Sequence, residues 1–118
     1  MKSIRKSLNL ITLQIFAPVL IIAGILGFIL PANVSLTSGA APYNIFHILF
    51  GIIGLALVLT RNERMIRLFN IGFGLIDIYQ AIASFLHLFP EHYFNWTRVD
   101  DLLHIIIGIA LVLIGLVG

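Results

Sequence analysis

The chain has 118 residues, of which 60% are apolar and 10% are charged, whereas soluble domains average about 45–50% apolar and about 25% charged. A short soluble chain has a large surface for its volume, so this composition excludes a water-soluble globule. The formal net charge is +2 and six of the seven basic residues lie in two short stretches, which excludes nucleic acid as a partner. Because the chain has no cysteine, any metal would be bound by histidine and carboxylate side chains.

Four apolar stretches follow one another along the chain, and each is close to the ~20 residues that cross about 30 Å of hydrocarbon as a helix. The first is longer than the apolar core of about 7–15 residues in a secretory signal peptide. We therefore predict an all-α membrane protein, a single domain over residues 1–118 that forms a four-transmembrane-helix bundle in the lipid bilayer. The predicted helices span residues 8–30, 43–60, 68–89 and 99–117.

The cations predict the orientation, because cytoplasmic loops retain lysine and arginine. Basic residues precede the first helix and recur between the second and third, whereas the other two loops carry Arg98 alone. Both termini are therefore expected on the cytoplasmic side. The cations that carry this prediction are Lys2, Arg5, Lys6, Arg61, Arg64 and Arg67. Three aromatic residues suit the outer interface, where amphipathic rings settle at headgroup level: Tyr43, Tyr93 and Trp96.

An internal repeat relates the two halves of the chain. Shifting the sequence by the separation of His47 and His104 aligns NIFHILFGI with DLLHIIIGI, which gives (Asn/Asp)-x-x-His-x-x-x-Gly in both segments. We therefore predict two helical hairpins, over residues 8–60 and 68–117, that are parallel repeats about an axis along the membrane normal. This arrangement differs from the inverted repeats of alternating-access transporters.

Small residues are expected to bring the helices together, because there is little hydrophobic driving force between helices in lipid. Spacings of three, four and seven residues place small residues on one face of three predicted helices. We expect these faces to meet at the centre of the bundle, without any need for a cofactor. The predicted packing glycines are Gly24, Gly27, Gly51, Gly54, Gly108 and Gly115.

The third predicted helix carries a single polar face. With Phe73 included, the residues of this face follow one another at alternating steps of three and four, and its polar members are Asn70, Asp77, Gln80, Ser84 and His87. Asp77 lies near mid-span, where an ionised Asp costs about 2.5–3.5 kcal/mol on insertion scales. We expect it to face the bundle interior as the neutral acid, with Gln80 or a hydroxyl group such as that of Tyr79 or Ser84 as its partner. The face is interpreted either as structural hydrogen bonding or as a relay for protons or cations.

All four histidines are expected in the outer half of the bundle: His47, His87, His92 and His104. With the neighbouring carboxylates of Glu91, Asp100 and Asp101 they offer ligands for a divalent metal such as zinc, copper or iron. Alternatively, paired imidazoles from His47 and His104 are candidates for binding a haem, and single ones for the magnesium of a chlorophyll. In a third interpretation the imidazoles are structural and bond a loop carbonyl or the side chain of Asn44 or Asp101.

The second predicted helix contains the pattern N-x-x-H-x-x-x-G-x-x-G, formed by Asn44, His47, Gly51 and Gly54. In this pattern the chain resembles a family of small four-helix bacterial membrane proteins of unknown function, found for example in cyanobacteria and actinobacteria. The resemblance runs from Asn44 to the end, and Leu111 departs from the second glycine in the fourth-helix copy of the pattern. It implies a bacterial inner membrane or a thylakoid membrane as the location, and no activity.

The sequence carries no nucleophile–base pair, phosphate-binding loop or H-E-x-x-H signature, so we do not expect an enzyme. We predict a non-catalytic integral membrane protein, an accessory or structural subunit that packs against other membrane protein subunits in a larger complex. The first alternative is a small binder of haem, chlorophyll or a metal ion through the outer histidines. The second alternative is a proton or small-solute pathway along the face that contains Asp77.

Overall fold

The structure is a computed structural model that describes residues 7–118, and these residues form helices and connecting loops without β-strands. In chain order, α1 spans Leu8–Ile29, α2 Ala41–Thr60, α3 Glu63–Leu86, α4 Glu91–Phe94 and α5 Arg98–Val117. Within this described part, α1, α2, α3 and α5 are each long and apolar enough to cross a membrane, which confirms the all-helical class and the four long helices. Three cations of the orientation prediction lie outside the described residues: Lys2, Arg5 and Lys6.

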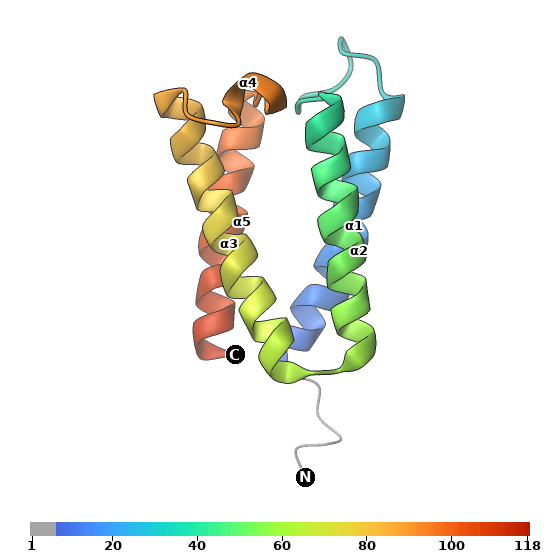
Figure 1. The fold of residues 1–118 in the computed structure, drawn as a ribbon, viewed down its shortest axis with the longest axis vertical. Coiled ribbons are helices and arrows are strands. Elements are labelled where there is room, and N and C mark those ends of the chain that lie inside the picture. Colours follow the sequence, from blue (N-terminus) through green and yellow to red (C-terminus); the bar gives the residue numbers. More distant parts are fainter. Residues whose placement is uncertain (1–6) are drawn as a thin grey trace.

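The long helices form two antiparallel hairpins that stand side by side (Figure 1). Most tertiary contacts join α1 to α2 and α3 to α5, so each hairpin is a closely packed unit. The start of α1, the turn between α2 and α3, and the end of α5 lie at one end of the molecule, and α4 lies at the other (Figure 1). At the first end, an Arg67 Nη2 group donates to the carbonyl oxygen of Gly118 at 2.7 Å, which ties α3 to the end of α5.

Local capping gives α3 boundaries that differ from the predicted ones. Asn62 caps the N-terminus of α3, because its side-chain oxygen accepts from the backbone N–H of Met65 at 3.2 Å. The helix therefore begins at Glu63 and includes most of a charged segment that was predicted as a loop. It ends at Leu86, before the predicted end, because His87 adopts a left-handed conformation with φ of 56°.

The predicted packing glycines lie against the partner helix of their own hairpin. Gly24 and Gly27 face α2, and an ideal Cβ on Gly24 would lie 2.6 Å from the backbone oxygen of Asn44. Glycines on α5 face α3 in the same way, and a Cβ on Gly115 would lie 2.3 Å from Ile71 Cγ1. The glycines thus bring backbones together within hairpins, whereas we expected their faces to meet at the centre of the bundle.

Phenylalanine rings fill the interface between the hairpins near its middle. The ring of Phe73 on α3 lies at the centre of this group, with centroid distances of 5.2 to 5.8 Å to four other rings. Such distances are those of favourable aromatic pairs. We call the group the phenylalanine layer; its members are Phe16, Phe46, Phe50, Phe69 and Phe73. Large aromatic side chains therefore hold the two hairpins together where small residues do not.

Candidate functional site

A cavity of about 150 Å³ lies between the two hairpins, on the α4 side of the phenylalanine layer. Phe16 and Phe73 of that layer line the cavity, together with apolar side chains of α1 and α5. Seven side chains with polar groups also line it, and two of them, Thr37 and Ser38, belong to the loop between α1 and α2. The other five come from α2, α3 and α5, and we call them the central polar site: Tyr43, His47, Asp77, Asp100 and His104. Three of these residues, His47, Asp77 and His104, are among the site residues predicted from the sequence.

Tyr43 connects two buried groups of α5. Its hydroxyl donates to Asp100 Oδ1 at 3.2 Å and lies 2.8 Å from His104 Nε2. With the hydroxyl hydrogen directed at the carboxylate, the Nε2–H of the imidazole donates to the tyrosine oxygen. Tyr43 is only 2% exposed, so its ring packs inside the protein and does not face outward. The three side chains form one hydrogen-bonded chain between the hairpins.

Asp100 is held in place by loops at the α4 end. Its Oδ2 accepts from the backbone N–H of Thr97 at 2.9 Å, and the Thr97 hydroxyl accepts from the backbone N–H of Asp100, which makes a capping box for α5. The same carboxylate oxygen accepts from the backbone N–H of Ser38, in the loop between α1 and α2, at 2.8 Å. One carboxylate therefore joins the two hairpins at this end and fixes the tyrosine that reaches it.

Asp77 belongs to a second hydrogen-bonded chain. Gln80 Nε2 donates to Asp77 Oδ1 at 3.1 Å, and Gln80 Oε1 accepts from Trp96 Nε1 at 3.1 Å. Gln80 was one of the three expected partners of Asp77, whereas the Tyr79 hydroxyl donates to the carbonyl of Phe89. Trp96 is 9% exposed, so this ring also packs inside the protein.

The predicted polar face of α3 is buried only in part. Asn70 is fully buried and donates to the side-chain oxygen of Asn9 at 3.0 Å, on the far side of the phenylalanine layer from Asp77. Ser84 is half-buried and the His87 side chain is 79% exposed, and both line a separate cavity at the periphery. Steps of three and four average less than a helical turn, so such a face rotates by about 20° per heptad around a straight helix.

The four histidines do not gather at one place. His47 and His104 line the central cavity, where the ring of Tyr43 lies beside both, at centroid distances of 4.2 and 5.9 Å. His87 and His92 lie on the exposed surface near α4 and do not line that cavity. Across residues 7–118, no three histidine or carboxylate side chains are grouped closely enough to hold a metal ion.

His104 carries an unsatisfied polar atom. The residue is 5% exposed, and its Nδ1 is buried without a hydrogen-bond partner among the described residues. An unpartnered buried group of this kind costs about 1–3 kcal/mol, so it calls for an explanation. The expected structural partners serve elsewhere: the Asn44 amide donates to the carbonyl of Gly39 at 2.9 Å, and Asp101 has an unpartnered oxygen of its own.

The volume of the cavity restricts what it holds. Pockets for drug-sized ligands measure about 300–1,000 Å³, whereas this cavity measures about 150 Å³. A cavity of about 150 Å³ holds a molecule of the size of benzene. A haem or chlorophyll between His47 and His104 would therefore require the hairpins to separate.

From the sequence, Tyr43 was expected only as an interface aromatic residue and Asp100 only as a carboxylate near the histidines, and their pairing was not predicted. Tyr43 and Asp100 each precede a site histidine by one helical turn, and the repeat shift aligns them with each other. That combination of spacing and repeat is the signal that could have revealed their pairing.

Comparisons with models of protein families, with curated proteins and with solved structures gave no match, so the function is inferred from this geometry.

Proposed function

We propose that the chain is an integral membrane protein whose four long helices span the bilayer, with both termini in the cytoplasm. Large apolar side chains cover the outward faces of these helices, for example Ile15 at 64% exposure and Leu113 at 54%. Extended apolar surfaces of this kind mark contact with a membrane or a partner. The Arg61–Arg67 segment lies at the same end as the start of α1 and the end of α5, and cations favour the cytoplasmic side.

We also propose that the two hairpins are parallel repeats, because equivalent glycines make the same contacts. In the first hairpin, an ideal Cβ on Gly51 would lie 2.9 Å from the carbonyl oxygen of Ala17 and 3.0 Å from the backbone nitrogen of Ile21. The repeat shift converts these three residues into Gly108, Gly74 and Ile78. The corresponding distances there are 2.8 and 3.1 Å.

A second observation supports the repeat. The same shift aligns Phe16 with Phe73, and their rings meet between the hairpins at a centroid distance of 5.6 Å. Tyr43 and Asp100 are likewise equivalent and hydrogen-bonded to each other. Contacts between equivalent positions are what a local twofold axis produces, as at a symmetric interface. The central cavity then lies on this axis.

In this membrane setting, we propose that the protein binds, without catalysis, one molecule about the size of benzene that carries a hydrogen-bonding oxygen. The observation that supports this function best is the buried and unpartnered Nδ1 of His104, in a residue that lines the cavity. The His47 imidazole lines the same cavity and has no hydrogen bond to any residue in the described part of the chain. Phe16 and Phe73 supply the apolar wall that a ring requires.

A binding site that ends at the phenylalanine layer accounts for this layer better than a proton or solute pathway does. A pathway needs polar groups or water along the whole bundle. Here Phe73 and the rings around it lie between Asp77 and the hydrogen-bonded pair of Asn9 and Asn70. The polar groups on the two sides of the layer are therefore separated by packed aromatic rings.

The role as an accessory subunit stays a prediction, and one surface feature of α3 favours it. Glycine costs about 1 kcal/mol relative to alanine inside a helix, so an interior glycine needs a reason. Apart from its own turn of helix, Gly72 has no atom of the described chain within 4 Å of an ideal Cβ. The missing side chain leaves room for the close approach of a partner helix. Purification in a mild detergent tests this role, and a monomer without a co-purifying protein would contradict it.

Thermal unfolding in the presence of phenol tests the proposed ligand class. Phenol is expected to raise the unfolding midpoint of the purified protein, because a ligand of the folded state stabilises it. Cyclohexane, similar in size and without an oxygen, should raise it less. His47→Gln should remove most of the phenol effect, whereas His92→Gln, on the exposed surface of α4, should keep it.

His47 is suited to this test because its imidazole has no hydrogen bond within residues 7–118, so the substitution leaves the Tyr43 chain intact. Absence of a phenol shift in the unmodified protein would refute the ligand class. Equal shifts in the two histidine variants would place phenol outside the central polar site and refute the assignment.

A further inference from the structure

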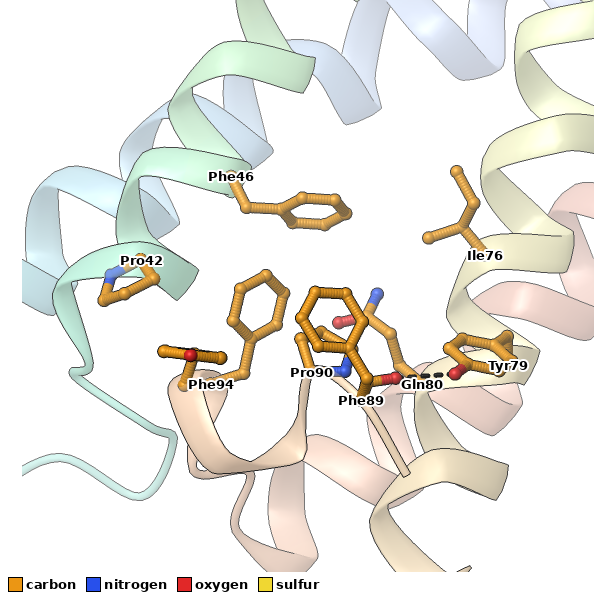
Figure 2. A pocket seen from close by; sticks show the side chains of 9 residues that line it. Pro42, Phe46, Ile76, Tyr79, Gln80, Phe89, Pro90 and Phe94 are labelled. Atoms are coloured by element: carbon orange, nitrogen blue, oxygen red, sulfur yellow. Dashed lines mark hydrogen bonds between the residues drawn. The ribbon is translucent and has the colours of Figure 1, made fainter. Parts of the chain in front are cut away.

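A second and larger cavity, of about 570 Å³, opens between α2 and α3 in the half of the bundle near α4. The two helices belong to different hairpins and diverge toward α4 (Figure 1), and the cavity between them is open to the surroundings and not enclosed. We call it the lateral groove. Figure 2 shows its walls, which are largely aromatic and apolar and include Pro42, Phe46, Ile76, Phe89 and Phe94.

We propose that the lateral groove binds a hydrocarbon chain of a membrane lipid, an inference that rests on the proposed insertion in the bilayer. The polar groups inside the groove are already engaged. The Tyr79 hydroxyl donates to the carbonyl of Phe89 (Figure 2), and the Gln80 amide is bonded to both Asp77 and Trp96. An occupant therefore finds ring faces and few free hydrogen-bonding groups, which selects for an apolar molecule.

The size of the lateral groove suits a single flexible chain. Its volume is about 570 Å³, and pockets of about 300–1,000 Å³ are typical of small-molecule ligands. A hydrocarbon chain is flexible and can follow the aromatic walls of a groove of this size.

The position of α4 suits the same occupant. The groove lies along the outer half of α3, from Ile76 to Gln80, and the α4 segment closes it at the end of the bundle. Tyr93 of α4 lines this end and is 55% exposed. Tyrosine rings favour the headgroup level of a membrane. A lipid headgroup would lie beside Tyr93, with its chain running inward along the aromatic walls.

Trp96 provides a direct measurement of occupancy. It is the only tryptophan, it is 9% exposed, and its ring contacts Phe94 of the groove wall at a centroid distance of 5.7 Å. Bromine atoms on lipid chains quench tryptophan fluorescence at short range only. In nanodiscs of phosphatidylcholine with brominated chains, we therefore expect Trp96 to be quenched relative to nanodiscs of the unbrominated lipid.

A matched pair of variants separates groove lipid from surrounding lipid. Ile76→Phe adds a ring inside the groove, and most of the quenching should be lost. Leu75→Phe adds the same ring at the neighbouring position, which is 54% exposed and does not line the groove. Its quenching should match that of the unmodified protein. Thermal midpoints of both variants check that they remain folded.

Three outcomes would overturn the proposal: no quenching in the unmodified protein, equal losses in the two variants, or a dimer in which a second copy of the chain shields Trp96. Flotation of the protein with lipid vesicles is measured alongside. If the protein floats with vesicles while Trp96 stays unquenched, only the proposal that a lipid chain occupies the groove is refuted. If the protein does not float, the proposed insertion in the bilayer is refuted.

Discussion

Tyr43 gives the central polar site its geometry, because its hydroxyl reaches two buried groups of α5 at once. Asp100 is 2% exposed and His104 is 5% exposed, so water does not replace the tyrosine at either partner. Hydrogen bonds in such surroundings are costly to leave unmade. The hydroxyl thus fixes the orientation of the His104 imidazole, whose other nitrogen is the free group of the site.

Removing this hydroxyl should destabilise the protein. Tyr43→Phe leaves Asp100 Oδ1 and His104 Nε2 without their shared partner, and we expect the free energy of unfolding to fall by about 1–3 kcal/mol. Tyr93→Phe is the control, because that residue is 55% exposed and its hydroxyl can bond to solvent. Denaturant unfolding in detergent measures both. Equal stability of the two variants would show that the Tyr43 hydroxyl contributes nothing to the fold.

Burial of some site residues could be predicted from the sequence and burial of others could not. A polar residue in an apolar helix has to face inward, and Asp77 and Asn70 are indeed buried. For Tyr43 and Trp96 the residue type alone is also compatible with an exposed position at a membrane interface. Their burial could not be predicted, because it depends on how they pack in the folded protein. His87 is exposed because it adopts a left-handed conformation and ends α3, and hydropathy does not signal such a helix end.

Among the elements, the two helices of each hairpin come into backbone contact at a glycine, and the two glycines, Gly51 and Gly108, are equivalent in the repeat. At Gly51 and Gly108 the nearest atoms to an added Cβ include backbone atoms of the neighbouring helix, which cannot move as a flexible side chain does. The helix boundaries were predictable within a few residues at most ends, because the apolar stretches are long. The start of α3 was not, since the Asn62 cap extends the helix into a charged segment.

Substitution of these glycines should loosen both hairpins alike. Gly51→Ala and Gly108→Ala are each expected to lower the free energy of unfolding by about 1–3 kcal/mol, because the added methyl group overpacks the contact. Gly72→Ala is the control, since nothing lies within 4 Å of its ideal Cβ. It should not destabilise the protein, because alanine favours the helix by about 1 kcal/mol. Thermal unfolding measures the stability of each variant. A loss of stability in only one of Gly51→Ala and Gly108→Ala would argue against equivalent repeats.

For the molecule as a whole, four apolar stretches suffice to predict four long helices, and short connections favour pairing of neighbours. The divergence of the hairpins toward α4 was not predictable, because it depends on the phenylalanine layer and on how α4 fills the space above it. The lateral groove follows from that divergence. The central polar site follows from it as well, because its cavity lies between the hairpins on the α4 side of the phenylalanine layer.

The central claim is that the four long helices cross a bilayer with the turn between α2 and α3 inside. Because the chain has no cysteine, single cysteines report their side directly. A membrane-impermeant maleimide should label Val34→Cys, in the loop between α1 and α2, in intact cells. It should label Asn62→Cys only after the cells are permeabilised. Labelling of Asn62→Cys in intact cells, or recovery of the protein in the soluble fraction, would contradict the account.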